Sequence, residues 1–193
     1  MFAPALIALL LLAAPAAMAQ SVPASGAVTT TGTARATIVA PLTLVKSSDM
    51  SFGRIAASAV AGTVTVDGQT NACVVTGGVL ETSSCQAAVF TGMGTKNMNA
   101  RISLTAVNNL TGPGTAMALT NVFLYNDATI SFAGNPNANG KGVGLTQGNG
   151  NQRYSIISNS GVFTLKLGGT LNVNANQAPG VYTGSITVTV QYQ

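Results

Sequence analysis

Few residues of this chain could carry out acid–base or nucleophilic chemistry. The 193 residues include no His and four acidic residues, which are Asp49, Asp67, Glu81 and Asp127. Without His, a Ser–His triad is impossible, and a Cys nucleophile would lack its usual base. Asp67 precedes Gly68 in a turn signal, and no two acids stand among the aromatic residues that would line a sugar cleft. We therefore expect a protein that is not an enzyme.

The two cysteines, Cys73 and Cys85, are the other residues with chemical potential. Between them lie Gly77 and Gly78, which can supply the positive φ of a tight hairpin turn. In an exported chain such a pair predicts a disulfide across the hairpin, and two reduced, buried thiols are the alternative. With no His, the chain offers too few ligands for a zinc site, and no glycine-rich segment matches a phosphate-binding fingerprint. We expect no cofactor.

The distribution of charge argues against nucleic acid as a partner. Eight Lys and Arg residues and four acids give a net charge of +4. The basic residues are spread from Arg35 to Lys166 and never cluster in the sequence, whereas nucleic-acid-binding proteins gather them into a patch or stripe. We expect a dispersed, solvated set of charges.

The N-terminal segment is typical of an export signal. Residues 1–19 hold a short apolar run that ends in Ala17-Met18-Ala19, as at a cleavage site before Gln20. No later stretch is apolar for long enough to span a bilayer, so we expect no membrane span after cleavage. The chain is expected to be exported, to the periplasm and then to the cell surface or the extracellular space. Residues 20–33, which are small and polar, predict an extended N-terminal arm, and residues 34–193 one domain.

Polar and apolar residues alternate along most of that domain, which predicts β-strands. Between Ala34 and Leu44 every second residue is apolar, and Pro41 restricts this strand to an edge or a bulge. Further strands are expected in the segments GTVTVDG, AAVFTG, ARISLTAV, MALTNVFLYN and GVFTLKLGGTLNV. The expected core residues are Met50, Phe52, Val89, Ile102, Leu104, Leu119, Val122, Leu124, Phe163, Leu165, Leu167, Leu171 and Val173. The pattern predicts an all-β fold, an immunoglobulin-like antiparallel β-sandwich.

The segment 134–152 interrupts the alternation. It is rich in Gly and Asn, has almost nothing to bury and contains no Asp or Glu that would neutralise a calcium ion. We expect an exposed loop. Two interpretations stay open, a ligand-binding tip and an insertion that the fold tolerates.

The C-terminal strand is the most informative segment. Ile186, Val188, Val190 and Tyr192 alternate with Ser, Thr and Gln up to the last residue, without a charge. Uncharged strand edges of this kind invite association unless something covers them. The strand is either an ordinary sandwich strand, paired on both sides within its own domain, or a strand that another chain covers.

Two resemblances bear on that choice. The penultimate Tyr192, Gly180 as the fourteenth residue from the end and the alternation between them resemble the C-terminal pattern of chaperone–usher pilins. The segments ATIVAPLTLVKSSDMSFGRIAA, GTVTVDG and GTLNVNANQAPGVYTGSITVTVQY are similar to a bacterial family of exported sandwich domains of unknown function, related to spore coat protein U. This second resemblance covers residues 36–68 and 163–193 but not residues 71–152.

The resemblance implies a pilin-like sandwich that lacks one strand, so that a groove exposes its core. A periplasmic chaperone would lend the missing strand, and the N-terminal arm of another pilin subunit would replace it at an outer-membrane usher. Ile186, Val188, Val190 and Tyr192 would lie along the groove, and Gly180 would permit the backbone turn that starts the strand.

The arm is the candidate donor strand in this scheme. Val22, Ala24, Gly26 and Val28 share one face of an extended chain, although Pro23 removes a backbone donor, and an unstructured spacer is the alternative. The resemblance thus implies a structural subunit of a bacterial surface fibre, a pilus or fimbria, that supports adhesion or biofilm formation. The alternative is a self-complete secreted or surface binding module, its fold closed by the strand of residues 34–44, with carbohydrate or host affinity in its loops.

Overall fold

The computed structural model describes residues 30–106, 108–133 and 152–193. The chain divides into two units, Met1–Thr37 and Ile38–Gln193. In the first unit the described residues 30–37 are exposed and form no strand. Outside the described residues lie the expected signal peptide, residues 134–151 and the arm residues Val22, Ala24, Gly26 and Val28. No helix in the described ranges is long and apolar enough to cross a membrane.

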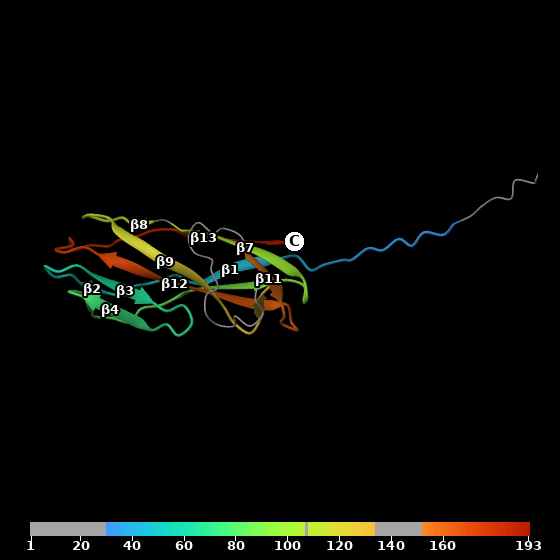
Figure 1. Cartoon of the computed structure of the whole chain (residues 1–193), viewed down its shortest axis with the longest axis horizontal. Helices are drawn as coiled ribbons and strands as arrows, with labels where there is room; N and C mark the ends of the chain where they lie inside the picture. Colours follow the sequence, from blue (N-terminus) through green and yellow to red (C-terminus); the bar gives the residue numbers. More distant parts are fainter. Residues whose placement is uncertain (1–29, 107, 134–151) are drawn as a thin grey trace, which may run out of the picture. The chain divides into compact units, whose positions relative to one another are not determined.

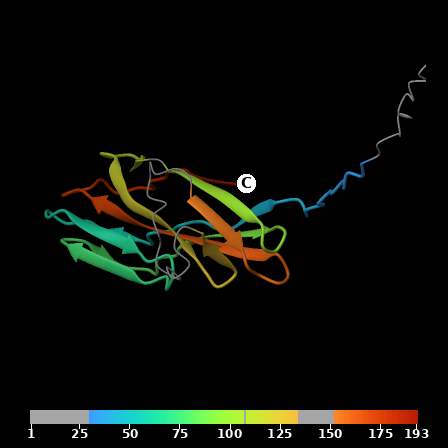
Figure 2. The same cartoon turned by 45° about the vertical axis from the view of Figure 1, so that its right-hand side comes forward.

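The second unit is an all-β antiparallel sandwich, as the alternation predicts (Figures 1 and 2). In chain order the strands are β1 (Thr43–Ser48), β2 (Ile55–Ala56), β3 (Gly62–Val66), β4 (Cys73–Gly77), β5 (Leu80–Glu81), β6 (Ala88–Met93), β7 (Asn99–Ala106), β8 (Asn109–Leu110), β9 (Met117–Asn126), β10 (Ile130–Phe132), β11 (Gln152–Ile156), β12 (Val162–Val173) and β13 (Ile186–Tyr192). The five longer strands expected from the quoted segments are all present, as β3, β6, β7, β9 and β12.

The larger sheet is built around β12, its longest strand. Along one edge β12 pairs with β6 and then with β3, and along the other edge with β9. Figure 1 shows β9 and β12 side by side along this sheet. β1 extends the sheet beyond β6, β4 beyond β3 and β8 beyond β9. Gly168 lies where β12 changes partner, and a Cβ there would be 2.3 Å from the carbonyl oxygen of Val66. Only Gly permits that approach.

The second sheet has four strands in the order β10, β11, β7, β13. Its strands also pair antiparallel throughout. β13 is therefore the outermost strand at one end of this sheet. A separate pair, β2 with β5, completes the described strands.

Alternate side chains of the sheets meet in one hydrophobic core. Phe163, Leu165 and Leu167 of β12 are fully buried. The expected core residues are buried except Met50 and Val89, which are half buried. Val89 was wrongly assigned to the core because its neighbours Ala88 and Phe90 occupy the inward positions of β6. Burial of apolar surface is the main stabilising contribution, about 25 cal/mol per Å².

Tyr182 anchors the connection between β12 and β13. Its hydroxyl donates to the carbonyl of Ala178 at 2.9 Å and accepts from the amide of Gly114 at 3.0 Å and from Nε2 of Gln177 at 2.7 Å. A Tyr that bonds back to the backbone a few residues upstream, just before a strand, is the tyrosine corner of immunoglobulin-like sandwiches. The contact fixes the path of the chain into its last strand.

The first strand is shorter than the sequence predicts. It begins at Thr43 and not at Ala34, and the described residues before it form no strand. Pro41 has no backbone N–H to donate to a sheet, and Ile38 is 96% exposed, so its apolar position packs against nothing. Before Pro41 the alternation did not reflect burial, whereas Leu42 and Leu44 do pack against the core.

The turn between the cysteines also differs from the prediction. Gly77 has the expected positive φ, 70°. The strands on either side of it are not partners of each other, because β4 pairs with β3 and β5 with β2. The turn therefore passes the chain from one sheet to another, and the expected hairpin is wrong.

Candidate functional site

β13 is an edge strand whose inward side chains are incompletely covered. It pairs with β7, and no other described strand pairs with it. Its inward residues Ile186, Val188, Val190 and Tyr192 are half buried against the core, whereas the inward side chains of β12 are buried. The apolar side of β13 is thus accessible from the side on which a further strand would lie.

β1 forms the edge of the other sheet and has the same property. Its described partner is β6. Leu42 and Leu44, at its start, and Met50, just after its end, pack against the core but are half buried. Two incompletely covered rows of apolar side chains therefore flank the sandwich, one from each sheet.

The surface is hollowed beside the start of β13, where Ile186 of the inward row lines a hollow. One hollow of about 270 Å³ reaches from Lys46 to Ile186, and core residues such as Phe90 and Leu119 line it. A second hollow of about 700 Å³ continues it past the start of β13. The two share Met50, Phe52, Leu110 and Tyr182. We call the two hollows, with the inward rows of β1 and β13, the edge groove.

One end of the edge groove is closed by Tyr192. Its hydroxyl donates to the carbonyl of Ala40 at 2.8 Å and accepts from the amide of Thr95 at 2.7 Å. The Thr95 hydroxyl accepts from the amide of Ala40 at 2.7 Å, which completes the link. β13 ends at this closure and β1 starts near it, so the two strands run in opposite directions along the groove.

Gly180 lies at the other end, where it lines the larger hollow. Its φ of 150° is a conformation that residues with a Cβ rarely adopt, and a Cβ would lie 2.5 Å from Cγ of Pro113. Three residues later, Thr183 exchanges two backbone hydrogen bonds of 2.9 Å with Thr111. Gly180 is thus required for the close packing of the segment that leads into β13.

The edge groove combines apolar core residues with three charged residues, Arg54 in the larger hollow and Lys46 and Asp49 in the smaller one. On its rim, Nζ of Lys46 lies 2.6 Å from Oδ1 of Asp49, and both side chains are more than half exposed. An exposed pair of this kind contributes under about 1 kcal/mol. The perturbed tyrosines lie outside the groove lining: burial raises the pKa of Tyr154 to about 12, and burial followed by the charge of Asp67 raises the pKa of Tyr125. The inward row of β13, which is apolar and uncharged, therefore suits an apolar occupant.

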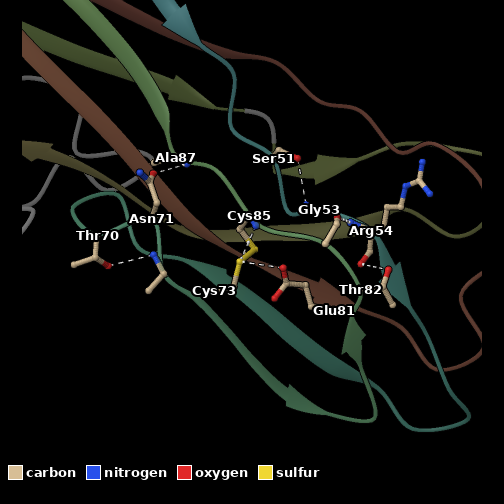
Figure 3. Close-up of a disulfide and its surroundings, with 12 residues drawn as sticks. Ser51, Gly53, Arg54, Thr70, Asn71, Cys73, Glu81, Thr82, Cys85 and Ala87 are labelled. Carbon is tan, nitrogen blue, oxygen red and sulfur yellow. Dashed lines mark hydrogen bonds between the residues drawn. A yellow bond between two sulfur atoms is a disulfide. The ribbon is translucent and has the colours of Figure 1, made fainter.

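The disulfide does not itself line the groove, but the lining residues Ser51, Gly53 and Arg54 lie in its surroundings (Figure 3). Cys73 and Cys85 are bonded, as predicted, with their Cα atoms 5.7 Å apart. Beside it, Oδ1 of Asn71 accepts from the amide of Ala87 at 3.0 Å, and an Oε1 of Glu81 lies 3.3 Å from Sγ of Cys73. Because both sulfurs are joined to each other, neither offers a thiolate that could ligate a metal with Glu81.

Other acids of the described chain serve local structure. Oδ1 of Asp67 accepts from the amides of Gln69 and Thr70, at 2.7 and 2.9 Å. Oδ1 of Asp127 accepts from the amide of Thr129 at 2.8 Å. Both are turn contacts of the kind that Asp makes with its own backbone. The expectation that the protein is not an enzyme stays a prediction.

The β13 side of the edge groove was predictable from the sequence, whereas two residues that line its hollows were not. Of the predicted residues, Gly180 and Ile186 line the hollows, and Val188, Val190 and Tyr192 continue the half-buried row along β13. Leu110 and Tyr182 were not anticipated as groove residues, because they lie in a two-residue strand and in a connection, where no periodicity exists. For Tyr182, the tyrosine-corner spacing back to Ala178 was an available signal.

The fold and the groove define the class of the protein: an all-β sandwich with an accessible apolar groove between two sheet edges. Residues 42–192 match the family described as Domain of unknown function (DUF4402), and the chain belongs to this family. The match includes both sides of the edge groove and also residues 71–152, which the expected resemblance left out. Comparison with curated proteins and with solved structures gives no match.

Proposed function

We propose that the protein is a structural subunit of a bacterial surface fibre that is assembled by donor-strand complementation, in the manner of chaperone–usher pilins and the spore coat protein U group. The single observation that carries the proposal is the half-burial of Ile186, Val188, Val190 and Tyr192 along an edge that no described strand covers. A strand added there would pair with the backbone of β13 and bury this row.

The direction and the length of the missing strand follow from the sheet that it would extend. The four-stranded sheet is antiparallel, so a strand that continued it would run antiparallel to β13, from the Tyr192 closure toward Gly180. The arm of residues 20–33 in another subunit has a suitable length, since 14 extended residues reach about 46 Å and the seven of β13 span about 23 Å. In the arm, Val22, Ala24, Gly26 and Val28 would face the core.

The proposal includes partners that act before assembly. While the groove is uncovered, the inward row of β13 stays half exposed. In the chaperone–usher scheme a periplasmic chaperone covers it and an outer-membrane usher exchanges the chaperone for the next subunit. Fibres built in this way serve adhesion or biofilm formation, and this is the role we propose.

A self-complete binding module is the competing function. It would require a strand from its own domain beside β13. The N-terminal strand that was the candidate, β1, is paired with β6 in the other sheet, and its apolar residues Leu42 and Leu44 are themselves half buried. This placement favours completion by another chain.

The test compares two adjacent substitutions on β13 in the exported chain. Val188 faces the groove and Thr189 faces solvent, so V188D places a charge in the groove and T189D does not. We expect the wild type and T189D to form concentration-dependent polymers by light scattering, and V188D to stay monomeric. Circular dichroism and the intact disulfide check that V188D is folded.

A second measurement covers the case in which V188D does not fold. A synthetic peptide of residues 20–33 should bind the wild-type chain and raise its unfolding temperature. A peptide with Val22 and Val28 replaced by Asp should not. A wild-type chain that stays monomeric at high concentration and ignores the peptide would refute the proposal.

A further inference from the structure

The outer face of the four-stranded sheet carries two arginines from neighbouring strands. Arg153 of β11 lies directly opposite Arg101 of β7, and Arg101 lies directly opposite Gln191 of β13. The flanking residues Tyr154 and Ile102 are buried, so the arginines occupy the outward positions. Directly opposed residues have Cβ atoms about 5 Å apart. The strand register thus brings together two basic residues that are far apart in the sequence.

No carboxylate compensates this pair in the described part of the chain. There, the ion pair that forms is Lys46 with Asp49. Arg153 donates from Nε to the amide oxygen of Gln193 at 2.7 Å, and no described group accepts from the Arg101 guanidinium. The segment 134–151, which precedes β11, contains no acidic residue. Neither arginine therefore forms an ion pair within the described part of the chain.

Such an arrangement costs stability in the isolated domain. Like charges directly opposite each other across a sheet repel, and natural chains rarely keep a local conflict that brings no gain. The chain has eight basic residues, and strand register places two of them side by side. An anion bound between the guanidinium groups would turn this repulsion into two charge-assisted contacts.

The side chains beside the pair are polar, and none of them is acidic. Outward positions beside it hold hydroxyl and amide side chains, and Oγ of Ser155 donates to Oδ1 of Asn99 at 2.6 Å. The outward positions around the arginines are Asn99, Ser103, Thr105, Ser155, Thr187, Thr189 and Gln191. None of them is aromatic, so the face lacks the stacking surfaces with which proteins bind single-stranded nucleic acid. Hydroxyl and amide groups suit the hydroxyl groups of a sugar chain.

We propose that this outer face binds an acidic polysaccharide, with Arg101 and Arg153 each holding a sulfate or carboxylate group of the polymer. The planar guanidinium group matches both oxyanions in a bidentate way. An exposed sheet face holds a single small ion weakly, because water screens the contact, whereas a polymer engages both arginines at once. The site lies on the opposite side of the sheet from the core and does not use the edge groove.

The experiment measures binding of the full chain to immobilised heparin, polygalacturonate and neutral dextran. R101Q with R153Q should weaken binding to the acidic polymers roughly tenfold or more, because a charged bidentate contact is lost at each position. K96Q with K166Q is the matched control, since it removes two positive charges elsewhere on the surface, and it should change binding less than about twofold. R101K with R153K should restore part of the affinity.

The comparison of the polymers shows which acidic group is recognised and whether the two arginines are responsible. Preference for heparin identifies sulfate as the recognised group, and preference for polygalacturonate identifies carboxylate. An equal loss in the Lys control would mean that net charge alone binds the polymer and would overturn the proposal. Binding to dextran as tight as binding to the acidic polymers would also overturn the proposal, and so would no binding to either acidic polymer. Single-stranded DNA is a further probe, and tighter binding to it than to the acidic polymers would overturn the proposal as well. Unfolding curves of the Arg variant establish that it is folded, and fibre assembly has no part in the outcome.

Discussion

The hydroxyl of Tyr192, next to the end of the chain, donates a 2.8 Å hydrogen bond to the carbonyl of Ala40, which precedes the first strand. The two residues are 152 positions apart and belong to the edges of different sheets. Through its second bond, from the amide of Thr95, the same hydroxyl holds the turn between β6 and β7. A single phenol therefore sets the spacing of the two edges at the closed end of the groove.

Tyr192→Phe tests this closure. The change removes two hydrogen bonds and leaves the amide of Thr95 without its partner, so we expect a loss of about 1–2 kcal/mol in the free energy of unfolding. Urea unfolding measures the loss, and hydrogen exchange should show faster exchange at the Thr95 amide. Thr187→Val, on the exposed outer face of the same strand, is the control and should change stability by less than about 0.5 kcal/mol. Unchanged exchange at Thr95 would contradict the assignment.

Gly180→Ala tests the entry into β13. Its φ of 150° and the 2.5 Å approach of Cγ of Pro113 leave no room for a Cβ, so we expect a loss of about 1–3 kcal/mol. Gly169→Ala is the matched control, because its φ is not positive and a Cβ there would have its nearest neighbour at 3.4 Å. Thermal unfolding of both variants measures the difference. Equal stability of the two would show that Gly180 is not conformationally required.

The inward face of β13 was predictable because an edge strand on a packed core has a strict period of two. Val188 and Val190 followed from that pattern without knowledge of any contact. The same argument failed between Ala34 and Ala40, where alternation continued but the described residues form no strand. Periodicity reports the side on which a residue would be buried, and pairing decides whether it is buried.

The pairing of the central strands β9 and β12 contains a change of register that the sequence pattern does not predict. In β9, Leu119 and Val122 are both buried although they do not share the parity of one face. Asn121, with a φ of 50°, and the register shift at Gly168 absorb the extra residue. The pairing of Arg101 with Arg153 could not be predicted for the same reason, because strand order and register come from long-range packing and not from local pattern.

Replacement of Cys73 and Cys85 by Ser tests the disulfide. The bond closes a loop with a sequence separation of 12, which corresponds to about 3 kcal/mol on the chain-entropy estimate. We expect the double variant to unfold at lower urea concentration than the oxidised wild type. The wild type under reductant is the control and should match the variant. A variant as stable as the oxidised protein would show that the disulfide does not constrain the unfolded chain.

Tyr154 makes the free energy of unfolding depend on pH in the alkaline range. Burial, to 1% exposure, raises its pKa to about 12, whereas the unfolded chain releases the same proton near about 10. Between these values the unfolded state binds fewer protons than the folded state, so stability falls as pH rises. The contribution of the protonated Tyr154 to the free energy of unfolding is fully present below about pH 10. It decreases by about 1.4 kcal/mol per pH unit up to about pH 12.

Tyr154→Phe removes this dependence and keeps the ring against Phe132, where the two centroids are 5.5 Å apart in the wild type. We expect the difference in unfolding free energy between wild type and variant to be constant below about pH 10 and to shift in favour of the variant above it. Tyr125, whose pKa burial also raises, is present in both proteins and cancels in the comparison. Urea unfolding at half-unit steps of pH gives the two curves. Parallel curves up to pH 12 would mean that the Tyr154 hydroxyl reaches water in the folded state.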